Sequence, residues 1–481
     1  MQSRKIGTGD VAKASVWYTV SNFLAKGIGY LTLPIFARLM TKTELGDYSN
    51  FLVWIDILTI IVGISIESSI NRARIDYPGK LDEYCSTILL FTSALAGVAY
   101  LIVQAFMPVF SKWWSLEPFY IHMIFVYLMV LHAYSILMAR QRIFYRYKAS
   151  VALSLGYAVG STVCSIILVI IMQDKYMARS VGHILPYILI CVPAYVYLVK
   201  KGKTFKWSYC KYAVLFCWPF VPHLLALKVL NASDRIMITN MIGSEATATY
   251  TIANNCVSIA TLFFTSLNTA ISPWVFDKLV EKDYKALKQI TLPYIGCFVV
   301  LVQLIQLMAP EVLLIIGGAQ YIEAKECFLP LFSSVVVQFC YALYVNIEQY
   351  SRKTWAIAAG TLLAAVVNVA LNLWLIPIFG YVVAAYTTLV GYCVLFLVHY
   401  TFVRIIGYKN IYNDKFVFMA ILYAIGMQVV IRFLYNNTII RYAVVAVLMI
   451  GIVIALVKNK EQILQLLKRK KKPKVSTEKA V

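Results

Sequence analysis

Charged residues are scarce in this chain, and their scarcity excludes several classes of protein. Only 14% of the 481 residues are Asp, Glu, Lys or Arg, whereas 61% are hydrophobic. Soluble domains average about 25% charged and 45–50% apolar residues. The composition therefore excludes an ordinary cytosolic enzyme and a disordered protein. The net charge of +22 does not by itself indicate a nucleic-acid partner, so no nucleic acid is expected.

Motifs of metal sites and of enzymes are missing as well. The ten cysteines never occur as C-x-x-C, which argues against a zinc site and against a disulfide framework. Gly202-Lys203-Thr204 resembles the end of a P-loop, but Tyr197 stands where that motif requires glycine. G-x-S-x-G, H-E-x-x-H and G-x-G-x-x-G do not occur. We therefore expect no catalytic residues, no metal and no cofactor.

Long apolar segments fill most of the sequence. A helix that crosses a bilayer needs about 20 apolar residues. Fourteen segments approach this length, at 15–37, 48–66, 85–107, 119–139, 150–172, 181–199, 212–241, 248–273, 290–309, 327–347, 355–376, 380–403, 416–434 and 442–457. The seventh is long enough to tilt or break, and the last is short. The sequence predicts an all-α polytopic membrane protein with about 14 transmembrane helices.

The basic residues predict the orientation of these helices. Lysine and arginine concentrate in alternate connections, including 200–211 and 278–288, and in the tail after residue 457. Because cytoplasmic loops carry the excess of Lys and Arg, both termini are expected in the cytoplasm. The net charge of +22 is then mostly a consequence of topology. The first apolar segment lacks an A-x-A-like site and is interpreted as an uncleaved span.

Two halves of the chain resemble each other weakly. Aligning Tyr48 with Tyr250 places Lys26 on Lys228. Six crossings are an even number, so a six-span repeat keeps its orientation in the membrane. We expect two pseudo-symmetric six-helix lobes, at 1–211 and 212–410, followed by two extra helices and a basic cytoplasmic tail at 411–481.

Ionisable residues inside the apolar segments are the candidate functional residues. Each costs at least ~2.5–3.5 kcal/mol at mid-span and normally faces a cavity or a partner. On the seventh segment Lys228, Asn231 and Arg235 stand at i, i+3 and i+7, so they share one helix face that fits a cavity wall. Alternatively, Arg235 pairs with Asp234 or extends to the outer interface.

The remaining polar residues of the spans have several interpretations. Asp56 is a possible ion site, although we favour its being the counter-ion of Lys26. Asp234 is a second possible ion or counter-ion site. Asn368 and Asn372 are four residues apart on one span and are expected to join helices by hydrogen bonds. Isolated histidines of the spans, such as His399, are more often packing residues than proton relays.

Three stretches resemble the multidrug/oligosaccharidyl-lipid/polysaccharide (MOP) exporter superfamily, and within it the Wzx-type polysaccharide flippases. They are ARLMTKTELGDYSN, SDRIMITNMIGSEATATYTIANN and NVALNLWLIPIFGYVVAAYTT. The resemblance implies a MATE-like fold of two six-helix lobes around a central cavity that opens alternately to each side. It also implies cationic cavity residues that hold a diphosphate, at Lys26 and Lys228 with Asn231 and Arg235 nearby. The two extra helices would form a groove for a polyprenyl tail.

The expected function is therefore a flippase of the bacterial cytoplasmic membrane. It would move an undecaprenyl-diphosphate-linked oligosaccharide from the inner to the outer leaflet, for cell-surface polysaccharide biosynthesis. Its partners would be this lipid-linked oligosaccharide, membrane lipids and other polysaccharide-assembly proteins. The alternatives are a cation-coupled multidrug or metabolite exporter of the same fold and a polysaccharide polymerase or ligase. Short outer connections argue against the enzyme, and the excess of cavity cations argues for an anionic substrate.

Overall fold

The computed structural model describes residues 8–144, 147–351 and 353–458, and this part of the chain is built of helices alone. The basic tail at 459–481 lies outside the described residues. The long helices are α1 (Thr8–Leu39), α2 (Lys42–Gly63), α4 (Leu81–Ala105), α6 (Pro118–Ile143), α7 (Tyr147–Ile171), α8 (Lys175–Gly202), α10 (Val221–Met241), α11 (Ser244–Val280), α12 (Tyr284–Leu307), α14 (Lys325–Tyr350), α15 (Thr354–Phe379), α16 (Val383–Ile405), α17 (Asp414–Leu434) and α18 (Thr438–Lys458).

Short helical elements connect some of the long helices. They are η1 (Ile66–Ser69), α3 (Ile70–Asp76), α5 (Met107–Trp114), α9 (Trp207–Cys217), η2 (Trp218–Phe220), α13 (Ala309–Ile316) and η3 (Ala319–Ala324). The seventh apolar segment breaks, as its length allowed, because α9 and α10 are separated by the 3₁₀ turn η2. Pro219 and Pro222 lie at the first positions of η2 and α10, where their missing N–H groups are tolerated.

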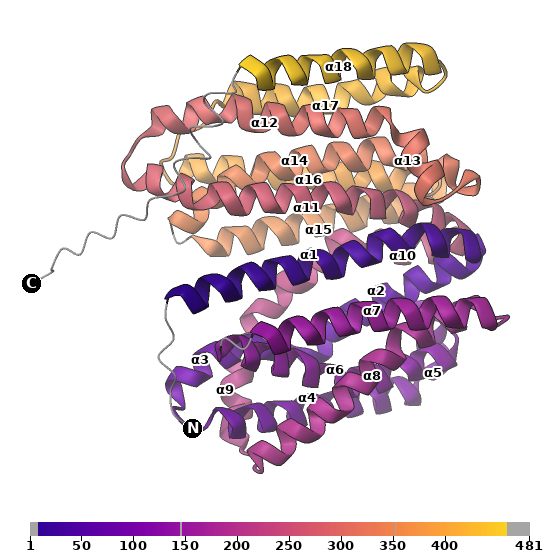
Figure 1. Cartoon of the computed structure of the whole chain (residues 1–481), viewed down its shortest axis with the longest axis vertical. Coiled ribbons are helices and arrows are strands. Elements are labelled where there is room, and N and C mark those ends of the chain that lie inside the picture. The colour runs from indigo at the N-terminus through magenta and orange to yellow at the C-terminus, as the bar shows by residue number, and fades with distance from the viewer. Residues whose placement is uncertain (1–7, 145–146, 352, 459–481) are drawn as a thin grey trace, which may run out of the picture.

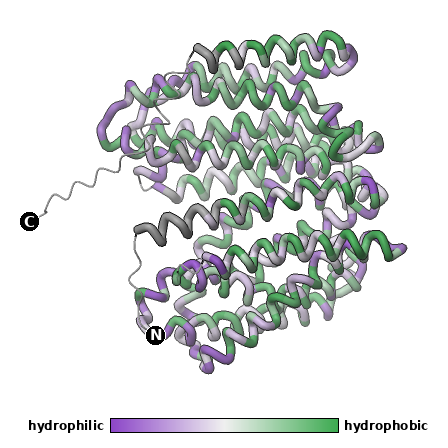
Figure 2. The backbone as a smooth tube through the Cα atoms, in the orientation of Figure 1, coloured by the Kyte–Doolittle hydropathy of each residue, from purple (hydrophilic) through white to green (hydrophobic). Residues whose placement is uncertain are grey.

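Within the described residues, twelve helical segments are long and apolar enough to cross a membrane. They account for all the expected spans except the first and the last, which correspond to α1 and α18. Hydrophobic residues cover the middle of most helices, and hydrophilic residues gather toward their ends (Figure 2). The chain is thus a multi-pass membrane protein.

The helices pack as two groups with the same internal order. In the first group, each helix packs on the next in the order α1, α7, α8, α6, α4. In the second group, the corresponding order is α10, α15, α16, α14, α12. Figure 1 shows the two groups stacked along the long axis, with α1 and α10 between them. Since each helix of one series has its counterpart at the same place in the other, the packing agrees with a six-span repeat.

The contact between α2 and α11 supports the repeat independently. Ser49 on α2 shares a hydrogen bond of 2.8 Å with Thr251 on α11, and these residues are 202 positions apart. Thr43 donates to Glu245 at 3.4 Å, again across 202 positions. Equivalent residues of two related units meet only at the axis that relates them. The pseudo-two-fold axis therefore passes between α2 and α11, at the offset that aligns Lys26 with Lys228.

The last two helices are fixed to the outside of the second group. α17 packs on α12 and α14, and α18 packs on α12 and α17, at the edge of the bundle (Figure 1). The buried Arg441 side chain of α18 donates to Glu311 of α13 and to the carbonyl of Leu307 at 3.0 Å. Arg432 of α17 pairs with Glu326 of α14 at 3.0 Å. These contacts make α17 and α18 part of the second group.

Candidate functional site

A cavity of about 470 Å³ lies where α2 of the first group meets α10 of the second. This interlobe cavity is lined by Asp56, Thr59, Ile60, Leu224, Leu227, Lys228 and Asn231. The Lys228 ammonium lies 2.5 Å from the Asp56 carboxylate, so one ion pair joins the two helix groups. The Asp56 and Lys228 side chains are 49% and 30% exposed. Ion pairs this accessible contribute only about 0.2–1 kcal/mol, so a competing anion can displace Asp56.

The partner of Asp56 differs from the one favoured by the sequence. We expected Lys26 as its counter-ion, but Asp56 pairs with Lys228. The reason is the packing order, because α2 contacts α10 directly whereas α1, which carries Lys26, packs mainly on α7. Lys26 is exposed and lines neither of the cavities found in the described residues. Its part in substrate binding stays a prediction.

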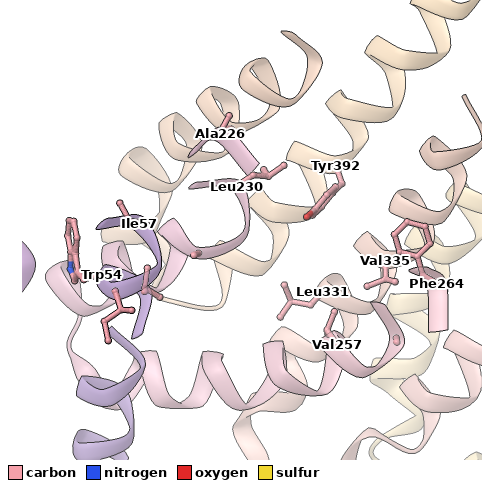
Figure 3. Packing of buried hydrophobic residues seen from close by; sticks show 14 of the residues in the cluster. Trp54, Ile57, Ala226, Leu230, Val257, Phe264, Leu331, Val335 and Tyr392 are labelled. Atoms are coloured by element: carbon pink, nitrogen blue, oxygen red, sulfur yellow. The ribbon is translucent and has the colours of Figure 1, made fainter. Parts of the chain in front are cut away.

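A second cavity, of about 200 Å³, lies within the second helix group. Residues from α10, α11, α14 and α16 line this Arg235 cavity: Leu230, Asn231, Asp234, Arg235, Asn254, Val257, Ser258, Thr261, Leu331, Ser334, Gln338, Thr388 and Tyr392. Figure 3 shows four of these lining residues, Leu230, Val257, Leu331 and Tyr392, on four different helices. Asn231 belongs to both cavities, and it accepts a hydrogen bond of 2.7 Å from the Tyr392 hydroxyl. The polar face of α10 thus forms a wall of both.

Asp234 is held by hydrogen bonds from three other helices. The hydroxyls of Tyr250 on α11 and Thr388 on α16 donate to one carboxylate oxygen at 2.6 and 2.7 Å, and the Asn372 amide of α15 donates to the other at 2.6 Å. No ion pair joins Asp234 to Arg235 in the described part of the chain, so the local pair considered from the sequence does not form. Asn368 donates to Thr388 at 3.3 Å, which confirms that the two asparagines join helices.

Sequence reasoning missed a buried acid. Glu348 is fully buried on α14 and lies 2.8 Å from His399 on α16, which is also fully buried. The predicted span ended at residue 347 and placed Glu348 in a connection, whereas α14 continues to Tyr350. The hydrophobic pattern weakens near the end of this helix, so an accurate boundary required the tertiary packing. His399 therefore has a buried acidic partner on α14.

The polar stripe of α11 was also missed, although the sequence carries a signal for it. Asn254, Ser258 and Thr261 line the Arg235 cavity at i, i+4 and i+7 of one helix. That spacing places the three side chains on a single face. The helix-face argument that grouped Lys228, Asn231 and Arg235 on α10 would have found them, had it also been applied to helix faces without a charged residue.

A protein-family comparison decides the class of this protein. The family described as polysaccharide biosynthesis protein matches residues 11–278, more than half of the chain. The chain belongs to the polysaccharide biosynthesis protein family. The match covers the first helix group and continues through α10 and α11, so it includes Asp56, Lys228 and Arg235.

Relatives and solved structures agree with this membership. An uncharacterized membrane protein of Methanocaldococcus jannaschii is 23% identical over 92% of this chain and 94% of its own length. The lipid II flippase MurJ, in an inward closed conformation, matches the structure with a TM-score of 0.71 at 12% identity, over 93% of this chain and 100% of the MurJ chain.

A MATE-family multidrug transporter of the MOP superfamily, in an inward-facing conformation, shares the fold more distantly. Its TM-score is 0.53 at 15% identity, over 80% of this chain and 94% of its own. The MATE-like fold expected from the sequence is confirmed. This member of the polysaccharide biosynthesis protein family is a multi-pass membrane protein with the fold of flippases and transporters.

Proposed function

We propose that this protein is a flippase that moves an undecaprenyl-diphosphate-linked oligosaccharide from the inner to the outer leaflet of the bacterial cytoplasmic membrane by alternating access. The observation that carries the proposal is the interlobe cavity, where a lysine lies between two helix groups beside a carboxylate that an anion can displace. The family supports a role in polysaccharide biosynthesis, and the fold is that of a flippase. Membrane lipids and other polysaccharide-assembly proteins would be its partners.

The diphosphate would bind at Lys228 in place of Asp56. Lysine acts as a compact point charge, which holds an anion without fixing its geometry. A diphosphate carries at least two negative charges, and a second cation lowers the cost of bringing it into the cavity. Lys26, aligned with Lys228 by the repeat, would supply that charge, and Asn231 and Arg235 would meet the attached glycan. Since Asp56 belongs to α2 and Lys228 to α10, this exchange would release a contact between the groups.

The lobes would be residues 1–211 and 212–410, with 411–481 forming the additional helices and tail. Fourteen crossings with both termini in the cytoplasm agree with α1 beginning and α18 ending on the same side of the bundle (Figure 1). The anchoring of α17 and α18 to the second group suits a groove for the polyprenyl tail, which would stay in the lipid while the polar part crosses. We propose transport, and no catalytic role.

A cation-coupled exporter of the same fold is the second candidate, and the exposure of Asp56 favours it. That carboxylate is 49% exposed in a cavity and is the better of the two candidate ion sites. Both oxygens of Asp234 already accept hydrogen bonds from three donors, so Asp234 is better suited to join helices.

The test is movement of a fluorescent polyprenyl-diphosphate oligosaccharide across proteoliposomes, measured by quenching from outside. Wild type should move the lipid, and Lys228→Gln should lower the rate at least tenfold. Lys203→Gln is the matched control, because Lys203 is exposed directly after α8 and lines neither cavity. If wild type instead exports a cationic drug along an ion gradient and leaves the lipid in place, the exporter replaces the flippase.

A further inference from the structure

The Arg235 side chain lies at a cavity and is not held by the residues that the structure describes. Among the described residues its side chain forms no hydrogen bond and no ion pair, and its Nε atom is buried without a partner. Asp234, its neighbour in sequence, is occupied by Tyr250, Thr388 and Asn372. Arginine stays charged in proteins and offers five N–H donors in a planar fork. The buried Nε–H requires an acceptor, and the half-buried side chain of Arg235 lines the Arg235 cavity, from which an acceptor can reach it.

The other walls of this cavity match the groups of a sugar ring. The amides of Asn254 and Gln338 form no hydrogen bonds within the described residues, so each offers both a donor and an acceptor to the cavity. The hydroxyls of Thr261 and Ser334 donate to backbone carbonyls of their own helices, at 3.2 and 2.6 Å. Their lone pairs remain free to accept from ligand hydroxyls. Apolar side chains, such as Leu331, complete the lining and suit the C–H faces of a ring (Figure 3).

The size and charge of the cavity narrow the ligand further. Pockets for drug-sized ligands measure about 300–1,000 Å³, so a cavity of about 200 Å³ suits one sugar ring rather than an oligosaccharide. The single positive charge of a guanidinium balances the charge of one carboxylate, and its planar N–H groups can form two parallel hydrogen bonds to the two carboxylate oxygens. A diphosphate would bring at least two negative charges next to the carboxylate of Asp234, which makes it the poorer ligand at this place.

We propose that the Arg235 cavity is a glycan subsite that takes a single sugar carrying a carboxylate, with Arg235 holding the carboxylate and the amides of Asn254 and Gln338 holding ring hydroxyls. Asn231 forms part of both cavities, so the sugar would lie next to the diphosphate at Lys228. The subsite makes the flippase selective for acidic glycans. This inference rests on the proposed function.

Ligand protection of the purified protein tests the subsite directly, since a ligand that binds the folded state raises the midpoint of thermal unfolding. Sodium glucuronate, glucose and inorganic phosphate are compared at equal ionic strength. We expect glucuronate to stabilise wild type most, and Arg235→Gln to weaken its apparent affinity at least tenfold. Gln338→Met keeps the side-chain length, leaves Arg235 in place, and should weaken glucuronate severalfold. Lys203→Gln should match wild type.

Three results would overturn the subsite. They are no protection by glucuronate, protection by phosphate that equals or exceeds that by glucuronate, and unchanged glucuronate affinity in both Gln338→Met and any folded Arg235→Gln protein. If Arg235→Gln does not fold, Gln338→Met decides alone.

Transport separates this inference from the proposed function. Proteoliposomes receive one of two lipid-linked oligosaccharides, which are identical except that one sugar is glucuronate in the first and glucose in the second. We expect Arg235→Gln to lower the transport rate of the acidic substrate at least tenfold and that of the neutral substrate less than threefold. If wild type moves both lipids and the variant affects them equally, the subsite is wrong and the flippase stands. If wild type moves neither lipid although glucuronate protects it, the proposed function fails.

Discussion

Removing the charge of Asp56 should make the flippase bind its substrate more tightly. Asp56 occupies the Lys228 ammonium at 2.5 Å, and a bound diphosphate must take its place. Since the two side chains are 49% and 30% exposed, the pair is worth about 0.2–1 kcal/mol. Asp56→Asn abolishes the ion pair but keeps the size of the side chain. We expect the half-saturating concentration of the lipid-linked substrate to fall by up to about fivefold, which corresponds to ~1 kcal/mol.

The same change should slow release, because Asp56 no longer competes for Lys228 when the substrate leaves. Initial rates in proteoliposomes, measured over a range of substrate densities, give both quantities. Lys228→Gln supplies the opposite control, with a raised half-saturating concentration, and the double variant should resemble Lys228→Gln alone. A raised half-saturating concentration in Asp56→Asn would refute the competition. Loss of transport together with loss of response to a sodium or proton gradient would identify Asp56 as a coupling-ion site instead.

Other consequences of the same structure are testable. At Lys26 and at Lys228, charge should matter more than shape. Arginine at either position should therefore keep much of the flipping rate, whereas alanine should lose most of the rate and glutamate nearly all of it. Normal flipping by both alanine variants would contradict this prediction. Asn372→Ala should lower thermal stability by about 1–3 kcal/mol, because it removes a donor from the buried Asp234 carboxylate, whereas Asn71→Ala, at an exposed position on α3, should cost much less. Gly46→Ala should separate α2 from α11, because a Cβ there overlaps the Ser244 carbonyl, whereas Gly97→Ala meets open space; equal spin-label distances across α2 and α11 in both variants would exclude the effect. An imposed potential, negative inside, should accelerate outward flipping, and a rate that ignores the potential would refute electrical driving.

The sequence predicted the fold well because crossing a bilayer constrains composition strongly. Apolar runs of the right length located twelve segments that the structure also finds, and the prolines of the seventh agree with its break. The 202-residue alignment of the halves is supported by the Ser49–Thr251 contact. The first and last predicted crossings correspond to α1 and α18, which are not among the twelve, so these two crossings stay predictions.

Contacts between helices were the part that the sequence could not supply. Which lysine meets Asp56 depends on whether α2 packs on α1 or on α10, and hydropathy does not encode that choice. The Glu348–His399 pair required a helix end placed to within one residue. The Arg235 cavity combines residues from four helices, so only the face on α10 was predictable.

The charge balance of the two cavities decides which step the membrane potential can drive. An excess of cavity cations would make the empty carrier move with the field as well. In the structure, however, Lys228 is balanced by Asp56, and Arg235 stands next to Asp234, so the cavity residues nearly cancel. A potential is worth ~2.3 kcal/mol per elementary charge per 100 mV. The loaded carrier would bring the negative charges of the diphosphate across, whereas the empty one carries little beyond Lys26. The potential should therefore accelerate outward movement of substrate and leave the return of the empty carrier almost unchanged, a difference that pre-steady-state currents with and without substrate would measure.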